Sequence, residues 1–390
     1  MFSSRLPHHL DPNPLSLATA ALEAAGADLL DLTETNPTNV GLAYPSDVLA
    51  CLSNPLAGRY QPSAFGILSA REAVAADYAR RGTPVSADQI VLTASTSEAY
   101  SLLFKLLCDP GDNVLVPQPS YPLFELLTAL DGVPANPYRL DYNGVWTIDR
   151  DSVEKAISAR TRAILVVSPN NPTGSMLRED DREWLVGLCR ERALALIVDE
   201  VFADYPLAPR KDASSIVGED RALTFSLGGL SKSAGLPQVK LGWMVVGGPE
   251  AIVTKAMSRL EVICDSYLSV ATPVQLAAPE LIASGRAIRA VIARRLDENL
   301  DHLRRRLATS PSVTLLEPEG GWSAVLQVPA TELEDALVMR LLANDHVRIH
   351  PGYFFDFPRE AYLVVSLLPE PRVFATAIDR VLVAVEKGLS

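Results

Sequence analysis

Apolar and polar residues follow one another in blocks along residues 90–247, a pattern that predicts a layered α/β fold. Residues 163–167 and 194–198 are continuous apolar runs, as expected of strands covered on both faces. The predicted strands span residues 90–93, 113–116, 133–138, 163–167, 194–198, 223–226 and 242–246, with helices between them at 97–107, 123–130 and 179–191. Because this alternation forms right-handed βαβ units, we expect a mostly parallel seven-stranded sheet flanked by helices.

The pattern changes after about residue 273, where a long helical stretch, 274–307, is followed by shorter elements of both kinds. The predicted strands there are 323–328, 347–350 and 362–366, and the predicted helices are 332–343 and 372–387. We therefore expect a smaller α+β domain. The predicted divisions are an N-terminal arm with part of the small domain at 1–44, a large domain at 45–275, and a long connecting helix with the small C-terminal domain at 276–390.

The composition of the chain limits the kinds of molecule that the protein is expected to bind. The 390 residues are 48% hydrophobic and 21% charged, which is enough for a sizeable core. The net charge of −12 argues against binding to nucleic acid or an anionic membrane, which requires clustered Lys and Arg. No apolar run reaches the roughly 18 residues of a membrane span, and the first residues do not resemble a signal peptide. Four separated cysteines and five histidines show no metal-ligand spacing. We expect a cytoplasmic protein with small-molecule ligands and no metal.

A first candidate binding segment lies between a predicted strand and the helix after it. Ser95, Thr96 and Ser97 stand at the start of that helix. Free backbone N–H groups, hydroxyl donors and the helix dipole together suit a phosphate monoester. The alternative is an ordinary N-cap by Ser95 or Ser97, with Glu98 in the first turn.

Two more polar segments directly follow buried strands. Asn170 and Asn171 lie between prolines in a rigid loop that can aim an amide into a crevice; the alternative is a turn with Asx hydrogen bonds. Asp199 ends an apolar strand, where an unpaired carboxylate is costly. This carboxylate either pairs with a cationic ring such as a pyridinium, or forms a salt bridge or caps the next helix.

Lys232 lies among small residues after the predicted strand 223–226. A lysine that must lose its proton and attack an aldehyde requires such a partly desolvated setting. The alternative is a surface lysine in a Gly/Ser loop. Active sites of open α/β sheets gather at the carboxyl ends of strands, so the four segments are expected to meet there.

In order and spacing, the four segments resemble the class I and II aminotransferases of the aspartate aminotransferase superfamily, which are fold type I pyridoxal-phosphate enzymes. The resemblance runs from about Asp31 onward. It implies pyridoxal 5′-phosphate as cofactor. It also implies ping-pong transfer of an amino group, through pyridoxamine phosphate, between an amino acid or other amine donor and an oxo acid.

The resemblance gives a role to each matching residue. Lys232 corresponds to the lysine that binds the cofactor covalently and then moves the substrate proton. Asp199 corresponds to the partner of the pyridine nitrogen, Asn171 to the donor to the phenolic oxygen, and Tyr121 to the aromatic side chain that stacks on the ring.

The phosphate is assigned to a second group of residues. Ser95, Thr96 and Ser97 correspond to the phosphate cup. Tyr60 resembles the tyrosine that reaches the phosphate of the neighbouring subunit, which implies a homodimer with shared active sites.

Three positions depart from the family pattern. Lys240 stands where a phosphate-binding arginine is usual, which keeps the charge but loses the bidentate fork. Phe202 replaces a common tyrosine. Val364 occupies the position of the arginine that clamps the substrate α-carboxylate.

Three interpretations of the missing arginine stay open. Arg348 or Arg59 takes the carboxylate; the loop 35–39, including Asn39, supplies amide and backbone donors; or the substrate amine lacks an α-carboxylate. A further hypothesis rests on the apolar and aromatic residues near the predicted site. They favour a roomy, apolar-lined substrate pocket, with Trp322, Tyr353 and Val364 as its candidate residues.

Three function classes are consistent with these residues. The first is an aminotransferase. The second is a carbon–sulfur lyase or a decarboxylase on the same fold, since both also need Lys232, Asp199 and Asn171. The third is a non-catalytic protein that binds the same cofactor; the intact lysine and the lack of an attached DNA-binding segment argue against it.

Overall fold

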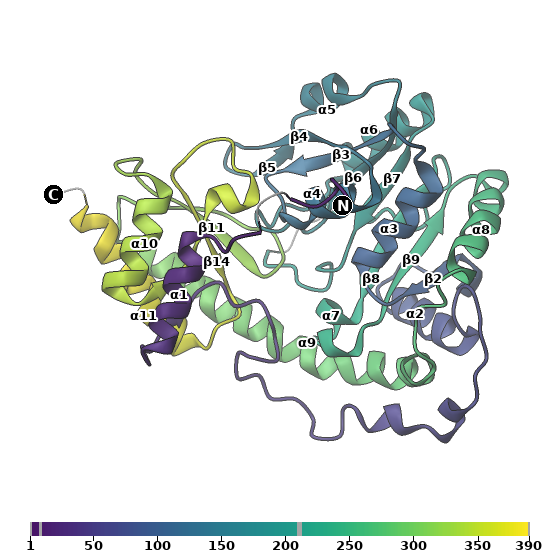
Figure 1. The fold of residues 1–390 in the computed structure, drawn as a ribbon, viewed down its shortest axis with the longest axis horizontal. Helices are drawn as coiled ribbons and strands as arrows, with labels where there is room; N and C mark the ends of the chain where they lie inside the picture. Colours follow the sequence, from purple (N-terminus) through teal and green to yellow (C-terminus); the bar gives the residue numbers. More distant parts are fainter. Residues whose placement is uncertain (1, 8–9, 209–212, 389–390) are drawn as a thin grey trace.

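The computed structural model describes residues 2–7, 10–208 and 213–388, and its largest feature is an eight-stranded sheet (Figure 1). The strand order is β2-β9-β8-β7-β6-β3-β4-β5. The strands are β2 Ile90–Thr93, β3 Asn113–Gln118, β4 Ala135–Tyr142, β5 Trp146–Ile148, β6 Thr161–Val167, β7 Ala195–Asp199, β8 Thr224–Gly229 and β9 Gly242–Gly247. The sheet has one strand more than predicted, because the three residues of β5 are too few to give a periodic signal.

Neighbouring strands in the middle of the sheet are parallel. The pairs β4–β3, β3–β6, β6–β7 and β7–β8 are all parallel. β9 is antiparallel to both β8 and β2, so β2 points the same way as β8. The carboxyl ends of β2, β3, β6, β7 and β8 therefore share one edge of the sheet, and this is the edge where the candidate segments begin.

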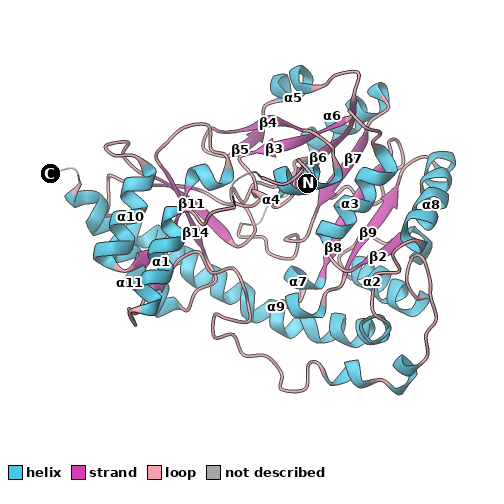
Figure 2. Ribbon diagram, viewed as in Figure 1, coloured by secondary structure: helices cyan, strands magenta, loops and turns pink. Residues whose placement is uncertain are grey.

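Helices cover both faces of this sheet, as Figure 2 shows. One face packs against α3 Thr96–Leu107, α4 Leu123–Asp131 and α8 Glu250–Asp265, and the other against α5 Arg150–Ala156, α6 Glu179–Arg192, α2 Leu68–Arg80 and α9 Thr272–Leu307. In β7, Ile197 faces the first set of helices, whereas Leu196 and Val198 face the second. Successive side chains of a strand point to opposite faces, so a continuous apolar run is what a doubly covered strand requires.

The rest of the chain forms a smaller sheet with its own helices. Its order is β10-β11-β14-β13, all antiparallel, with β10 Thr314–Leu316, β11 Ser323–Gln327, β14 Tyr362–Ser366 and β13 His350–Pro351. Helices α10 Glu334–Asp345 and α11 Pro371–Lys387 pack beside it. Helix α9 extends from α11 and β10 at the small sheet to α2 at the large one (Figure 1).

The N-terminal residues pack against the C-terminal part of the chain. Helix α1 Pro14–Ala24 contacts α10, and β1 Leu30–Asp31 pairs in parallel with β12 Val347–Arg348. The segment after β1 then leads toward the edge of the large sheet. Among the helices within the described residues, none combines the length and apolar character that crossing a bilayer requires.

Candidate active site

A cavity of about 250 Å³ opens at the carboxyl edge of the large sheet. Seven of the predicted site residues line it: Thr96, Ser97, Tyr121, Asn171, Asp199, Lys232 and Trp322. They come from the ends of β2, β3, β6, β7 and β8 and from the turn before β11. Strand direction explains why segments so distant in sequence meet there.

Lys232 lies in α7 Leu230–Ser233, a single turn that directly follows β8. The hydroxyl of Tyr205 donates a 2.7 Å hydrogen bond to the Lys232 carbonyl, which holds this turn in place. The Lys232 amine lies 4.7 Å from the centre of the Trp322 ring and 5.4 Å from that of Phe202. Burial lowers the Lys232 pKa to about 8, although Asp199 and Glu34 act in the opposite direction. A sizeable fraction of the amine is therefore neutral near pH 8, as a nucleophile requires.

Asp199 is the last residue of β7 and is buried. Its carboxylate accepts hydrogen bonds from the Tyr100 hydroxyl at 3.0 Å and the Val201 amide at 3.1 Å. Both donors are uncharged, and burial raises the Asp199 pKa to about 6. A protonated ring nitrogen in the cavity would supply the cation that this carboxylate needs, so the residue fits a pyridine cofactor.

Asn171 follows β6 in the proline-flanked loop. Its side-chain oxygen accepts a 3.4 Å hydrogen bond from the Ser323 hydroxyl at the start of β11. That contact links the large sheet to the small one at the cavity wall, and it engages the amide oxygen. The amide nitrogen is the atom that the resemblance assigns to the phenolic oxygen of the cofactor.

The sequence offered two interpretations of the start of α3, a phosphate site and an ordinary N-cap, and its residues divide between them. Ser95 is the N-cap, and its hydroxyl accepts a 3.1 Å hydrogen bond from the Glu98 amide. Glu98 in turn accepts a 2.6 Å hydrogen bond from the Ala94 amide. Ser95 thus serves the helix, whereas Thr96 and Ser97 line the cavity. The first N–H groups of a helix have no partner within it, which suits an anion there.

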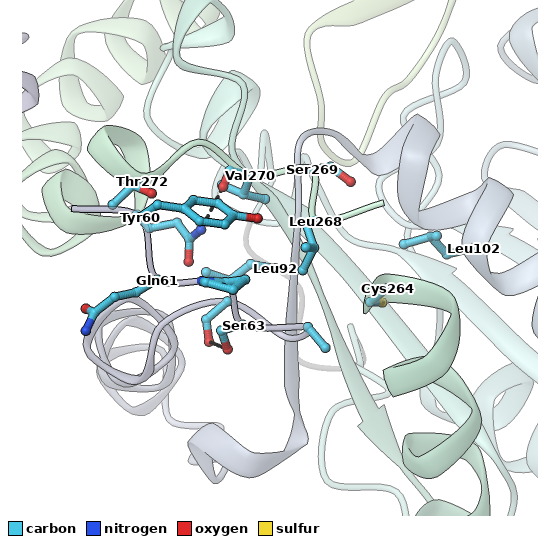
Figure 3. A pocket seen from close by; sticks show the side chains of 14 residues that line it. Tyr60, Gln61, Ser63, Leu92, Leu102, Cys264, Leu268, Ser269, Val270 and Thr272 are labelled. Atoms are coloured by element: carbon cyan, nitrogen blue, oxygen red, sulfur yellow. Dashed lines mark hydrogen bonds between the residues drawn. The ribbon is translucent and has the colours of Figure 1, made fainter. Parts of the chain in front are cut away.

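Two residues predicted to bind the cofactor do not line this cavity. Tyr60 is 73% exposed and lines a separate pocket with Leu268 and Thr272 (Figure 3). Lys240 is exposed, has left-handed backbone at φ 58°, and is not among the residues that line the cavity. Neither residue completes the site within its own chain.

Of the four predicted substrate residues, only Trp322 lines the cavity. Asn39 is exposed and donates a 3.1 Å hydrogen bond to Glu34. Tyr353 is 42% exposed, and its hydroxyl donates to Asp335. Val364 is a buried residue of β14 and belongs to the hydrophobic core, where packing decides its identity. The apolar part of the cavity wall is instead made by other residues: Leu123, Phe124, Leu127, Val167, Val201 and Phe202.

Sequence reasoning missed several residues that shape the site. Tyr100 lies one helical turn after Thr96 and so faces the same side of α3, a spacing that could have revealed it. Ser323 also lines the cavity, and Tyr205 supports Lys232 through the backbone. For these two residues no local pattern was available, since tertiary packing alone brings them to the edge of the sheet. Thr35, from the loop 35–39 that the sequence offered as a source of carboxylate donors, lines the cavity as well.

Comparison with known proteins identifies the family. The model of the family "Aminotransferase class I and II" matches residues 29–373. The chain belongs to this family. It is 31% identical over 381 residues to an alanine aminotransferase of Mycobacterium tuberculosis, covering 94% of this chain and 88% of the relative. It is 27% identical over 365 residues to the glutamate-pyruvate aminotransferase AlaA of Escherichia coli, covering 91% and 90%.

The fold of the family is also confirmed. The structure of an alanine aminotransferase from Pyrococcus furiosus superposes with a TM-score of 0.90 at 25% identity, covering 99% of this chain and 100% of that one. Members of the family depend on pyridoxal phosphate, so this chain is a pyridoxal-phosphate-dependent aminotransferase. The named relatives favour amino transfer over the lyase, decarboxylase and non-catalytic alternatives.

Proposed function

We propose that this aminotransferase exchanges an amino group between an amino acid or other amine and an oxo acid, with Lys232 as the residue that moves the proton. The observation that supports this role is the position of the Lys232 amine, buried in the same cavity as the Asp199 carboxyl and close enough to act on its charge. Burial keeps part of the amine neutral, so it can take a proton from the substrate carbon.

The remaining residues bind and orient. Asp199 would hold the proton on the ring nitrogen, Asn171 would donate to the phenolic oxygen, and Thr96 and Ser97 would bind the phosphate at the start of α3. Tyr121 would cover one face of the ring. When bound, the cofactor withdraws electrons from the substrate carbon that loses its proton.

A second part of the proposal concerns assembly. We infer a cytoplasmic homodimer in which Tyr60 serves the phosphate site of the partner subunit. Tyr60 is 73% exposed, although a tyrosine ring has a large apolar area that is usually covered. In its own chain it lies in a pocket separate from the cavity that holds Lys232.

A half-reaction experiment tests the role of Lys232. Purified protein loaded with pyridoxal phosphate is mixed with an amino donor, and the absorbance of the bound cofactor is followed. Lys232→Ala should slow the change by about 10²–10⁴-fold, the usual contribution of a general base. Lys155→Ala, an exposed lysine on α5, is the matched control and should keep the wild-type rate.

Two outcomes would contradict the proposal. A Lys232→Ala protein that reacts at the wild-type rate would remove the assigned role. Release of ammonia with pyruvate, or of carbon dioxide, without conversion of the cofactor to its amino form would indicate a lyase or a decarboxylase instead.

A further inference from the structure

Two acidic side chains act on the pKa of the Lys232 amine. Asp199 and Glu34 are the charged groups whose fields reach Lys232. Asp199 is committed to the ring nitrogen under the proposed function. Glu34 directly precedes Thr35, which lines the cavity, so its carboxylate is the other acid to consider near the substrate. An acid there repels a second carboxylate and attracts an ammonium group.

Glu34 is held in place rather than free to swing away. One carboxylate oxygen accepts a 2.7 Å hydrogen bond from the Asn36 amide, and the other accepts a 3.1 Å bond from the Asn39 side chain. Its neighbour Thr35 lines the cavity. Both donors are uncharged, so these two hydrogen bonds fix the position of the carboxylate without pairing it with a cation.

No arginine among the residues that the structure describes lines the cavity to balance this acid. Among the described residues that line it, Lys232 is the single cation. Two other arginines are already engaged: Arg348 pairs with Asp31 at 3.2 Å, and Arg295 donates to the carbonyls of Val40 and Leu368 at 3.0 and 2.9 Å. Arg59, the other candidate named from the sequence, is exposed and does not line the cavity of its own chain.

We propose that the preferred amino donor is a primary amine whose reacting carbon carries no carboxylate, and that Glu34 determines this preference. This inference rests on the proposed function and names its substrate class. A carboxylate on the reacting carbon would lie near a fixed acid and would have no guanidinium to pair with, whereas an alkyl group there meets Phe202, Val201 and Trp322.

The exchange balances in two halves. In the first, the amine gives its amino group to the cofactor, and a water molecule supplies the oxygen of the aldehyde product, so the amine is oxidised to the carbonyl level. In the second, an oxo acid takes the amino group, releases water and is reduced to an amino acid. With no guanidinium in the cavity wall to bind its carboxylate, the oxo acid should have a high KM.

Matched substrate pairs test the preference. The pairs are 2-phenylethylamine with L-phenylalanine and 3-methylbutylamine with L-leucine, whose members differ only in the carboxylate. The half-reaction of the loaded protein is followed by absorbance, without any second substrate. We expect the second-order rate constant of the amine in each pair to exceed that of its amino acid about tenfold or more. This is the size of effect expected from one unpaired like-charge contact near a protein surface.

Binding gives a readout that does not depend on turnover. The Lys232→Ala protein loaded with cofactor is titrated with each member of a pair in a calorimeter, and the amine should bind more tightly than its amino acid. Glu34→Gln should reduce the amine-to-acid ratio of rate constants several-fold in the active protein. Glu191→Gln, an exposed acid on α6, is the control and should leave the ratio unchanged.

The outcomes distinguish a failure of the inferred substrate class from a failure of the proposed function. If the amino acids react faster than their amines, the inference is overturned and the proposed function stands. If neither member of either pair converts the bound cofactor, the proposed function itself fails. If Glu34→Gln folds, as shown by an unchanged Tm, and leaves the ratio unchanged, Glu34 is not the determinant.

Discussion

At the scale of single residues, the buried carboxyl of Asp199 is unfavourable to ionise. Asp199 is buried with only uncharged donors, and its pKa is raised from 3.8 to about 6. A carboxyl whose pKa is higher in the folded protein than in the unfolded chain destabilises the fold once it ionises. The destabilisation is absent below about pH 4 and grows as the pH rises from about 4 to about 6.

Replacing this carboxyl should therefore stabilise the protein without cofactor. Asp199→Asn keeps an acceptor for Tyr100 and removes the charge, so we expect up to about 3 kcal/mol more stability at pH 7 and little change at pH 4. Denaturant unfolding of the cofactor-free protein at both pH values measures this. Asp47→Asn, at an exposed position, is the control. The same Asp199→Asn change should weaken cofactor binding, and a variant that bound cofactor normally would contradict the role of Asp199.

At the scale of elements, three neighbouring hydroxyls at the start of α3 have two functions, capping the helix and facing the cavity. Ser95 caps the helix, and Thr96 and Ser97 face the cavity. The two tasks are physically separable because the cap satisfies an N–H of the helix from outside, while the next residues present their groups to a ligand.

Alanine substitutions should separate these tasks. Ser95→Ala should cost about 1 kcal/mol of unfolding free energy, the usual effect of losing an N-cap. Ser97→Ala should leave stability nearly unchanged and weaken binding of pyridoxal phosphate. Thermal unfolding of cofactor-free protein and equilibrium titration with cofactor measure the two effects. An equal loss of stability in both variants would show that the division is wrong.

At the scale of the whole molecule, the proposal that Tyr60 serves the partner subunit starts from its exposure. Gly66 and Arg71 help to shape the segment that carries it. Gly66 has φ +87°, where a side chain would clash with Leu92, and Arg71 donates to the Gly66 carbonyl at 3.1 Å. This segment is therefore held by its own chain, and the Tyr60 side chain points outward from it.

Hybrid dimers test whether Tyr60 serves the partner. Co-expressed Tyr60→Ala and Lys232→Ala chains should yield hybrids in which one site has both residues and the other has neither. Random assortment makes half of the dimers hybrid, so about one quarter of wild-type activity should return. Each variant alone should be much less active. No recovery in purified hybrids would show that Tyr60 does not act across the interface.

Much of this protein could be predicted from sequence because the signals are local. Apolar runs such as 163–167 and a helix of the length of 274–307 show their type within one element, and the α/β architecture and the aminotransferase family are confirmed. The residues at strand ends, Asn171, Asp199 and Lys232, could be located because strand direction brings carboxyl ends together, and the structure places them in one cavity.

Only the tertiary structure decided the rest. Whether Ser95 binds a ligand or caps a helix depends on which N–H groups surround it. Whether Val364 lines a pocket or belongs to a core depends on which residues pack against its face of β14. Tyr100 and Glu34 act on groups of the site across long sequence separations. Periodicity reports the neighbours of a residue along one helix or strand, whereas the environment of a side chain is made mostly by other elements, which the chain brings together only when it folds.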